Sequence, residues 1–138
     1  MCKLKSGIIL KDKIFIPDYD SHTQMLEELN INDTTKNAEN LFVRAELYPE
    51  NGDIFSDVDT WKFNVDQDIV PEWFVEEYEE QRMKNEVKKW YEKHVFIGID
   101  NLELFNGNFY LKDCKNTHLN NCTSEHYGNS TSKHLNNC

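Results

Sequence analysis

The sequence predicts an α+β protein in which a small antiparallel sheet is covered by one long helix. Apolar and polar residues alternate in LFVRAELYP, which indicates a half-buried strand, and TWKFNV indicates a strand that returns beside it. Between residues 72 and 93, apolar residues recur at helical spacing, with acids early and lysines late, as the helix dipole favours. A chain of 138 residues is long enough to bury the core that such a fold needs.

Two short strands and a short helix are expected before the hairpin. Ile8–Leu10 and Lys13–Ile16 are apolar runs joined by a Lys-Asp turn. Residues 22–29 carry apolar side chains at helical spacing behind Ser21, which we expect to cap a helix of about two turns. Asp33 is the expected cap of a second short helical turn.

The central elements should build most of the core. The strand at 42–47 and the returning strand Thr60–Val65 are expected to form a hairpin with a long connection. Pro71 opens the main helix, predicted over 72–93. Its expected buried stripe comprises Val75, Tyr78, Met83, Val87, Trp90 and Tyr91. The segments VFIGI, LELF and FYL then read as strands of the antiparallel sheet.

After Lys112 the composition changes to Asn, Ser, Thr, His and Cys. Written in eights, this tail reads LKDCKNT, HLNNCTSE, HYGNSTSK and HLNNC, with His first, an apolar residue second and Asn fourth. Short fixed-period repeats are typical of stacked β-turn units of solenoid type, although so few apolar residues also suit a flexible tail. We therefore expect two domains, an α+β domain over 1–113 and an octapeptide-repeat tail over 114–138.

His and Cys recur at every fourth position of the tail, which raises the question of a metal site. The six candidate ligands are Cys114, His118, Cys122, His126, His134 and Cys138. Thiolate and imidazole are zinc ligands, and residues four apart share one face of a strand or helix. Zinc motifs, however, pair two ligands on a tight knuckle and place a second pair elsewhere, whereas this run is unbroken. A repeat ladder is the favoured interpretation, zinc is the alternative, and no metal or cofactor is predicted.

The net charge of −10 is concentrated in the middle of the chain. Residues 17–80 hold 18 acids and three bases, whereas 1–16, 81–113 and 114–138 are each net positive. An acidic surface repels DNA, RNA and anionic membranes, and it attracts basic partners over a long range. The alternative is a well-solvated surface without a partner.

The chain shows no targeting or membrane-spanning pattern. No apolar run reaches the length of a signal peptide or the roughly 18 residues of a membrane span. We therefore expect a cytosolic protein whose four cysteines are reduced.

Catalytic motifs are weak throughout. The sequence contains no GxGxxG, P-loop, GxSxG, HExxH or CxxC pattern. Asp18, Asp20 and His22 stand close together and suit a metal or a general acid-base pair, but a helix cap at Asp20 or Ser21 explains them more simply. We therefore predict that the protein is not an enzyme.

The central block LFVRAELYPENGD, DTWKFNVDQDIVPEWFVEEYEEQRM and VKKWYEKHV resembles small proteins from phages and prophages of gut Firmicutes, in which a WKF–VDxD–PxW segment precedes an acidic-to-basic helix. The opening CKLKSGIILKDKIFIPDYDSHTQMLEELNI is similar to the same group. Some members continue into Asn-rich repeats, more usually NATV-like, where this chain has His and Cys. The resemblance implies a viral or mobile-element origin and implies nothing about catalysis.

Charge and resemblance together predict a non-enzymatic acidic phage accessory protein, located in the host bacterial cytosol, that binds and inhibits a basic host factor. An anti-CRISPR-like inhibitor that mimics nucleic acid in the groove of a defence nuclease is one such case. The expected protein-binding residues are Asp66, Asp68, Glu76, Glu77, Glu79 and Glu80. Trp73 and Phe74 are candidate anchors, or else pack on the sheet. The alternative function is a metal-binding or homo-oligomerisation module that uses the His/Cys tail.

Overall fold

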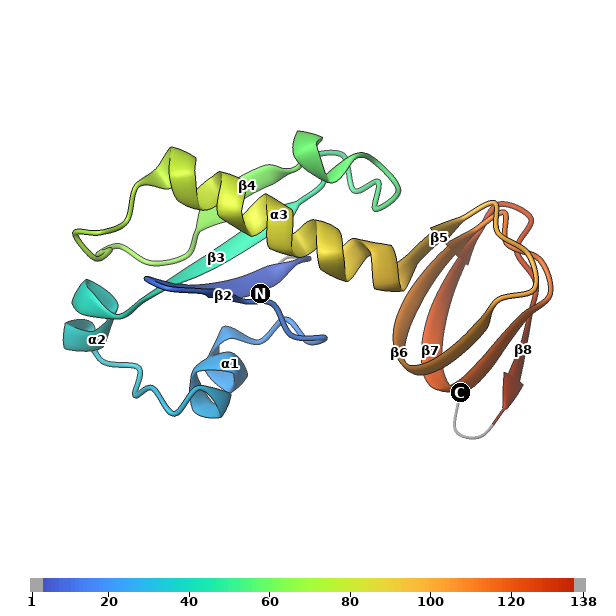
Figure 1. Ribbon diagram of the computed structural model, residues 1–138, viewed down its shortest axis with the longest axis horizontal. Helices are drawn as coiled ribbons and strands as arrows, with labels where there is room; N and C mark the ends of the chain where they lie inside the picture. Colours follow the sequence, from blue (N-terminus) through green and yellow to red (C-terminus); the bar gives the residue numbers. More distant parts are fainter. Residues whose placement is uncertain (1–3, 136–138) are drawn as a thin grey trace. The chain divides into compact units, whose positions relative to one another are not determined.

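The computed structural model describes residues 4–135. The chain divides into two compact units, Met1–Lys88 and Lys89–Cys138. The fold is mixed α/β, with one antiparallel sheet, one parallel sheet and a long helix α3 at Glu76–His94 (Figure 1). Within the described residues, no helix is both long enough and apolar enough to cross a membrane.

The first unit contains an antiparallel sheet of order β2-β1-β3-β4. Its strands are β1 (Ser6–Leu10), β2 (Ile14–Phe15), β3 (Phe42–Tyr48) and β4 (Lys62–Val65). The predicted hairpin of β3 and β4 is confirmed, because Ala45 lies opposite Val65 and Leu47 lies opposite Phe63. A short 3-10 helix, Val58–Thr60, shortens the returning strand at its start.

Helix α3 lies along one face of this sheet (Figure 1). A Cβ added to Gly7 of β1 would lie 3.3 Å from Cε of Met83, and Arg82 reaches the carbonyl of Leu10 at 3.5 Å. The helix begins at Glu76, four residues after the predicted start, because Pro71 opens a separate turn closed by the amide of Phe74.

The buried stripe of α3 differs from the prediction at its start. Met83, Val87 and Trp90 are buried as expected, but Val75 and Tyr78 are 58% and 63% exposed. Helical spacing explains the difference, since the positions four and eight residues before Val87 are Met83 and Glu79. Tyr78 is one residue out of phase, and Val75 precedes the helix.

Two short helices cover the opposite face of the sheet, so β3 is buried on both faces rather than half-buried as predicted. Neighbouring strand residues face opposite ways, and Ile8 therefore points away from α3. It packs with residues of α1 (His22–Glu28) and α2 (Thr35–Asn40) in a cluster of Ile8, Met25, Leu26, Ala38 and Phe42.

The caps of these helices are only partly as predicted. Ser21 caps α1, because its hydroxyl accepts from the amide of Gln24 at 3.2 Å. The prediction of Asp33 as the cap of α2 was wrong, since Thr34 accepts from the amide of Asn37 at 3.2 Å. Asp33 instead binds the guanidinium of Arg44 with both carboxylate oxygens, at 2.8 and 3.0 Å.

The second unit contains a parallel sheet of order β5-β6-β7-β8, which corrects the antiparallel arrangement expected for these strands. The strands are β5 (Val95–Ile97), β6 (Glu103–Lys112), β7 (Thr117–Tyr127) and β8 (Ser132–Leu135). Val95 pairs with Tyr110, Glu103 with His118, and Thr117 with Ser132. Each pair is 15 residues apart, and the pairing of β6 with β7 joins residues on both sides of the predicted boundary at 113/114.

Left-handed backbone positions repeat with the same spacing of 15 residues. Positive φ angles occur at Gly98, Asp113 and Gly128, at Asn101 and Asn116, and at Asn106 and Asn121. Gly and Asn tolerate this conformation better than other residues, so they place the bends at equivalent points of successive strands. The bends therefore recur at matching points of strands whose paired residues are 15 apart.

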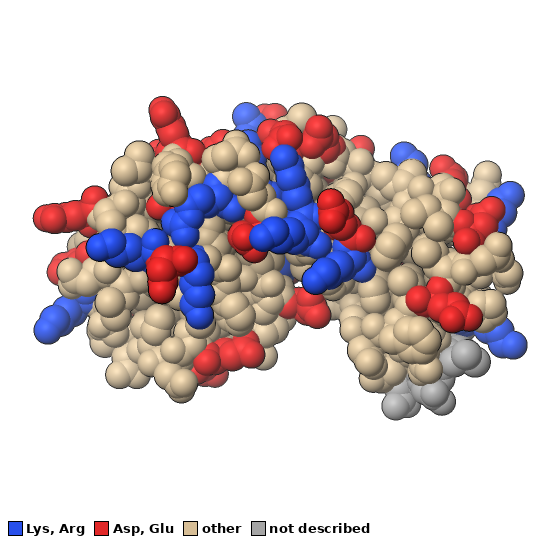
Figure 2. Space-filling view, in the orientation of Figure 1, with Lys and Arg blue, Asp and Glu red and all other residues tan. Residues whose placement is uncertain are grey.

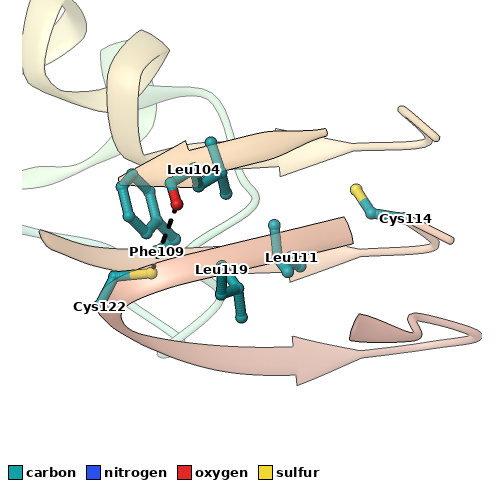
Figure 3. Packing of buried hydrophobic residues seen from close by; sticks show 6 residues of the cluster. All are labelled: Leu104, Phe109, Leu111, Cys114, Leu119 and Cys122. Atoms are coloured by element: carbon teal, nitrogen blue, oxygen red, sulfur yellow. Dashed lines mark hydrogen bonds between the residues drawn. The ribbon is translucent and has the colours of Figure 1, made fainter. Parts of the chain in front are cut away.

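Side chains from successive strands form the core of the second unit (Figure 3). Its buried members are Leu104, Phe109, Leu111, Cys114, Leu119 and Cys122. Leu104 lies opposite Leu119, and the rings of Phe109 and His94 stack at 5.7 Å between centroids. The second unit has few apolar side chains, and most of the buried ones gather in this one cluster.

Candidate functional site

The acidic charge lies entirely in the first unit. Residues 1–88 hold 20 acids and ten bases, whereas 89–138 hold five of each. On the face shown in Figure 2, Lys and Arg side chains gather along α3 among Asp and Glu, so the acids do not form one continuous patch there. A binding surface must therefore be located residue by residue.

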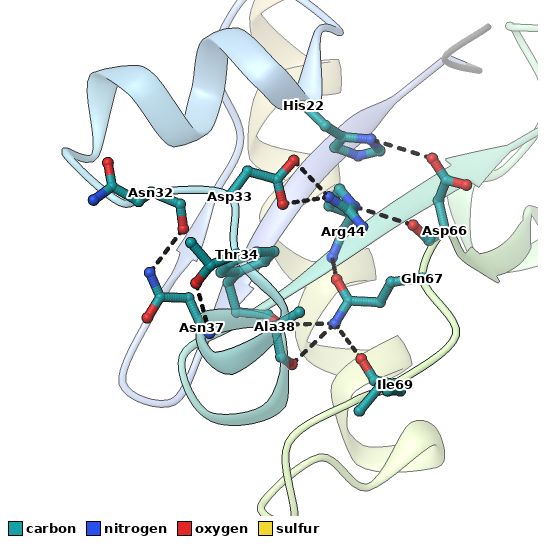
Figure 4. A network of polar contacts seen from close by, with 11 residues as sticks. His22, Asn32, Asp33, Thr34, Asn37, Ala38, Arg44, Asp66, Gln67 and Ile69 are labelled. Atoms are coloured by element: carbon teal, nitrogen blue, oxygen red, sulfur yellow. Dashed lines mark hydrogen bonds and ion pairs between the residues drawn. The ribbon is translucent and has the colours of Figure 1, made fainter.

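Asp66 and Asp68 lie in the loop between β4 and α3, and the start of this loop is held in a polar network (Figure 4). The Asp66 amide donates to the Arg44 carbonyl at 2.8 Å, and the Arg44 side chain donates to the Asp66 carbonyl at 3.1 Å. Gln67 donates to the carbonyls of Phe42 and Ile69 at 3.0 and 2.8 Å. The backbone is fixed in this way, while the Asp66 carboxylate stays 61% exposed beside His22.

The four predicted glutamates at the start of α3 do not share one surface. Glu76 and Glu77 are exposed. Glu79 is 2% exposed and pairs with Arg82, and Glu80 pairs with Lys84 at 3.1 Å. The exposed acids among the six predicted residues are therefore Asp66, Asp68, Glu76 and Glu77.

Large apolar side chains are exposed beside these acids, and sequence reasoning missed most of them. They are Leu41, Ile69, Val70, Val75 and Tyr78, with exposed fractions from 36% to 63%. The available signal was the pair Ile69 and Val70 between acids in DQDIVPE, an apolar step outside any predicted element. The two predicted anchors, Trp73 and Phe74, are both half-buried. The indole N–H of Trp73 donates to the Asn40 carbonyl at 2.9 Å.

Two surface cavities share Trp73 and Asn40 in their linings. The larger, about 710 Å³, is also lined by Leu10, Lys11, Asp12, Ile31 and Leu41. The second, about 410 Å³, is also lined by Glu39, Ile69, Val70 and Glu72. An exposed apolar centre with charged side chains around it has the anatomy of a protein interface.

The triplet Asp18, Asp20 and His22 is used in packing. The Asp20 carboxylate accepts from the Lys5 ammonium and the Ser6 amide, both at 2.9 Å. Burial lowers the pKa of Lys5, and the attraction of Asp20 opposes that shift. His22 is buried, with Nε2 2.9 Å from the Ala45 carbonyl oxygen. These contacts explain Asp20 and His22 as supports between β1, β3 and α1.

The spacing of four in the tail does not place His118 and Cys122 on one face of β7, which corrects the expectation from regular strands. Cys122 is 4% exposed inside the core, whereas His118 is only partly buried and pairs with the exposed Glu103. The left-handed residue Asn121 lies between His118 and Cys122 and breaks the alternation of side chains along β7. The octads also fall out of register, because His118 pairs with Lys133 and not with His134.

The structure offers no cluster of three or more metal-ligating side chains within the residues it describes. Cys114 and Cys122 are both buried in the core of the second unit. Cys138 and the side chain of His134 lie outside the part of the chain whose atoms are described. Zinc binding by the tail stays a hypothesis.

Comparisons of this chain with protein-family models, with curated proteins and with solved structures found no match.

Proposed function

We propose that the protein is a non-enzymatic acidic binding protein that captures a basic partner through the surface between β4 and the start of α3. The carrying observation is the juxtaposition of exposed acids with exposed apolar side chains in one short segment. Asp66, Asp68, Glu76 and Glu77 supply the charge, and Ile69, Val70, Val75 and Tyr78 supply the apolar contact.

The hydrogen bonds at the start of the segment support a binding role. Gln67 and Arg44 hold the loop through hydrogen bonds to β3 and to α2, so its side chains are presented without a large ordering cost. Charge then steers the partner to the surface, while the apolar side chains supply contact once water is excluded.

The proposed setting is a phage accessory protein in the host bacterial cytosol that inhibits a basic host factor, for example a defence nuclease. A groove that binds phosphates exposes Lys and Arg, and spaced carboxylates can occupy it. The ion pairs of Glu79 and Glu80 limit such mimicry to the four exposed acids.

Charge reversal tests this function. The variant Asp68→Lys/Glu76→Lys/Glu77→Lys changes three exposed carboxylates that have no ion pair among residues 4–135. The full-length protein is immobilised on a resin and incubated with host extract. Bound proteins are then quantified by mass spectrometry. We expect basic proteins captured by the wild type to be lost with the variant and to be released as the salt concentration rises.

A matched control separates local from total charge. The variant Glu27→Lys/Glu92→Lys/Glu103→Lys changes the net charge equally at exposed positions outside the segment. It should retain capture of the same proteins. If both variants capture the same proteins as the wild type, the proposed site is wrong. If both variants lose capture equally, binding depends on total charge and not on this segment.

A second candidate function uses the second unit. The 15-residue spacing of paired strands favours a short solenoid-like stack, and no strand pairs with the outer edge of β8 within residues 4–135. An unpaired edge of this kind is a template for another strand. We propose self-association of two copies through this edge.

Native mass spectrometry of the full chain tests the second candidate. A dimer mass that grows with protein concentration and persists in chelator supports edge pairing. A single subunit mass at all concentrations would contradict it, and a dimer lost on chelation would indicate zinc instead.

A further inference from the structure

Trp73 forms a shared wall of two neighbouring hollows in the first unit. Its indole is oriented by the hydrogen bond from Nε1 to the Asn40 carbonyl, which ties the turn before α3 to α2. The larger hollow includes Leu41, and the second hollow includes Ile69 and Val70. These three side chains are 47%, 48% and 36% exposed, so apolar surface is open in both.

The surroundings of the hollows are acidic. Glu39 and Glu72 line the second hollow, and both are exposed. Among the described residues neither carboxylate has a base within ion-pair distance. In the larger hollow the charges of Lys11 and Asp12 offset each other. The side chains that line the two hollows therefore carry a net negative charge.

We propose that the paired hollows at Trp73 bind one segment of a partner protein that presents two apolar side chains flanked by Lys or Arg. This inference rests on the proposed function and specifies the chemistry of the partner. One apolar side chain contacts Leu41 and the other contacts Ile69 and Val70. The flanking bases lie near Glu39 and Glu72.

Charge complementarity selects this occupant over an acidic or a purely apolar one. An acidic segment would bring like charges together at Glu39 and Glu72 without any base to neutralise them. A basic segment without apolar side chains would leave the indole and Leu41 in water, and it would lose the part of the binding energy that buried aromatic and aliphatic contacts supply.

The test is a titration of ¹⁵N-labelled full-length protein with synthetic peptides, followed by the indole N–H signal of Trp73. The first peptide has two leucines flanked by lysines, the second replaces the leucines by serine, and the third replaces the lysines by glutamate. We expect the first to shift the Trp73 signal and to bind at least about tenfold more tightly than either of the others.

The outcomes distinguish this inference from the proposed function. If the lysine-serine peptide binds as tightly as the first, the hollows are not the site, while acidic capture stands. If the glutamate peptide binds as tightly as the first, both the inference and the proposed function are wrong. If no peptide shifts the Trp73 signal, the inference is overturned.

A pair of surface variants completes the experiment. Leu41→Ser removes an apolar side chain that is 47% exposed in the larger hollow, and Ile97→Ser removes one that is 48% exposed in the second unit. Leu41→Ser should weaken the lysine-leucine peptide several-fold and leave the lysine-serine peptide unchanged. Ile97→Ser should change neither, and equal weakening by both variants would contradict the site.

Discussion

The two units of this chain differ in strand pairing and in net charge. In the first unit, strands pair antiparallel between layers of helix at varied sequence separations, and all the net charge of −10 is found there. In the second, parallel strands pair at a constant 15-residue spacing, and acids balance bases. A partner chosen by charge should therefore depend on the first unit alone.

The difference also extends to what holds each unit together. The first relies on a core closed on both faces of the sheet, with Phe42 and Ile8 fully buried between α1, α2 and the strands. The second has a thin core and repeated polar contacts, such as Asn116 to Asn101 at 2.7 Å and Asn121 to Asn106 at 2.9 Å. The stability of the first unit should therefore depend mainly on large buried side chains. The stability of the second unit should depend more on its left-handed bends.

Truncating a core side chain in one unit should give the largest loss of stability, and the loss should be confined to that unit. Phe42→Ala should cost about 3–5 kcal/mol and Leu119→Ala about 2–5 kcal/mol, because both side chains are fully buried. Amide hydrogen exchange should lose protection mainly in β1–β4 for the first variant and mainly in β6–β7 for the second. Equal loss in both sheets for either variant would show that the units unfold as one.

Glutamates on one helix should differ in their contribution to stability. Glu79→Gln should lower the free energy of unfolding by about 1–3 kcal/mol, because Glu79 is buried and paired with Arg82. Glu77→Gln, at an exposed position, should change it by less than about 0.5 kcal/mol. Urea denaturation measures both, and equal values would contradict the inward orientation of Glu79.

The bends of the second unit should respond to backbone preference. Asn121 has a φ angle of 54°, so Asn121→Ala should destabilise the unit by about 1–2 kcal/mol more than Asn121→Gly, since only alanine is strained there. Both variants lose the hydrogen bond to Asn106, which makes glycine the matched control. Thermal unfolding with the same loss for both would argue against a left-handed bend.

The smallest effect concerns a titration in the first unit. Burial, and then the hydrogen bond to Glu28, raises the pKa of Tyr19 to about 12. Because the pKa of Tyr19 in the folded protein lies above the ordinary tyrosine value of 10.0, the resulting stability is present below pH 10 and is lost as the pH rises toward 12. Glu28→Gln should lower the pKa of Tyr19, measured by NMR of labelled tyrosine rings. An unchanged pKa would contradict the contact.

Sequence patterns located most elements of the first unit because those elements follow local rules, but they misplaced the cap of α2 and the start of α3. The Ser21 cap and the Met83–Val87 stripe are each determined within a few residues, whereas the half-buried alternation predicted for β3 was overridden by helices on both faces of the sheet. The register of the second unit could not be obtained in the same way. Its period of 15 depends on left-handed residues such as Asn106 and Asn121, and the visible eight-residue repeat in the sequence does not match that spacing.

The candidate site was predictable in its charge but not in its shape. The acidic segment was visible in the sequence, yet its exposed members could be separated from Glu79 only after the phase of α3 was known. The hollows at Trp73 combine α2, β1 and the turn before α3, which are brought together only by the tertiary fold.

The most direct test is hydrogen–deuterium exchange of the full-length protein with and without the basic partner captured from host extract. The first-unit account predicts slower exchange in residues 66–80 and around Asn40 and Leu41, with no change in β6 and β7. Protection confined to β6–β8 would contradict the account and would assign partner binding to the second unit.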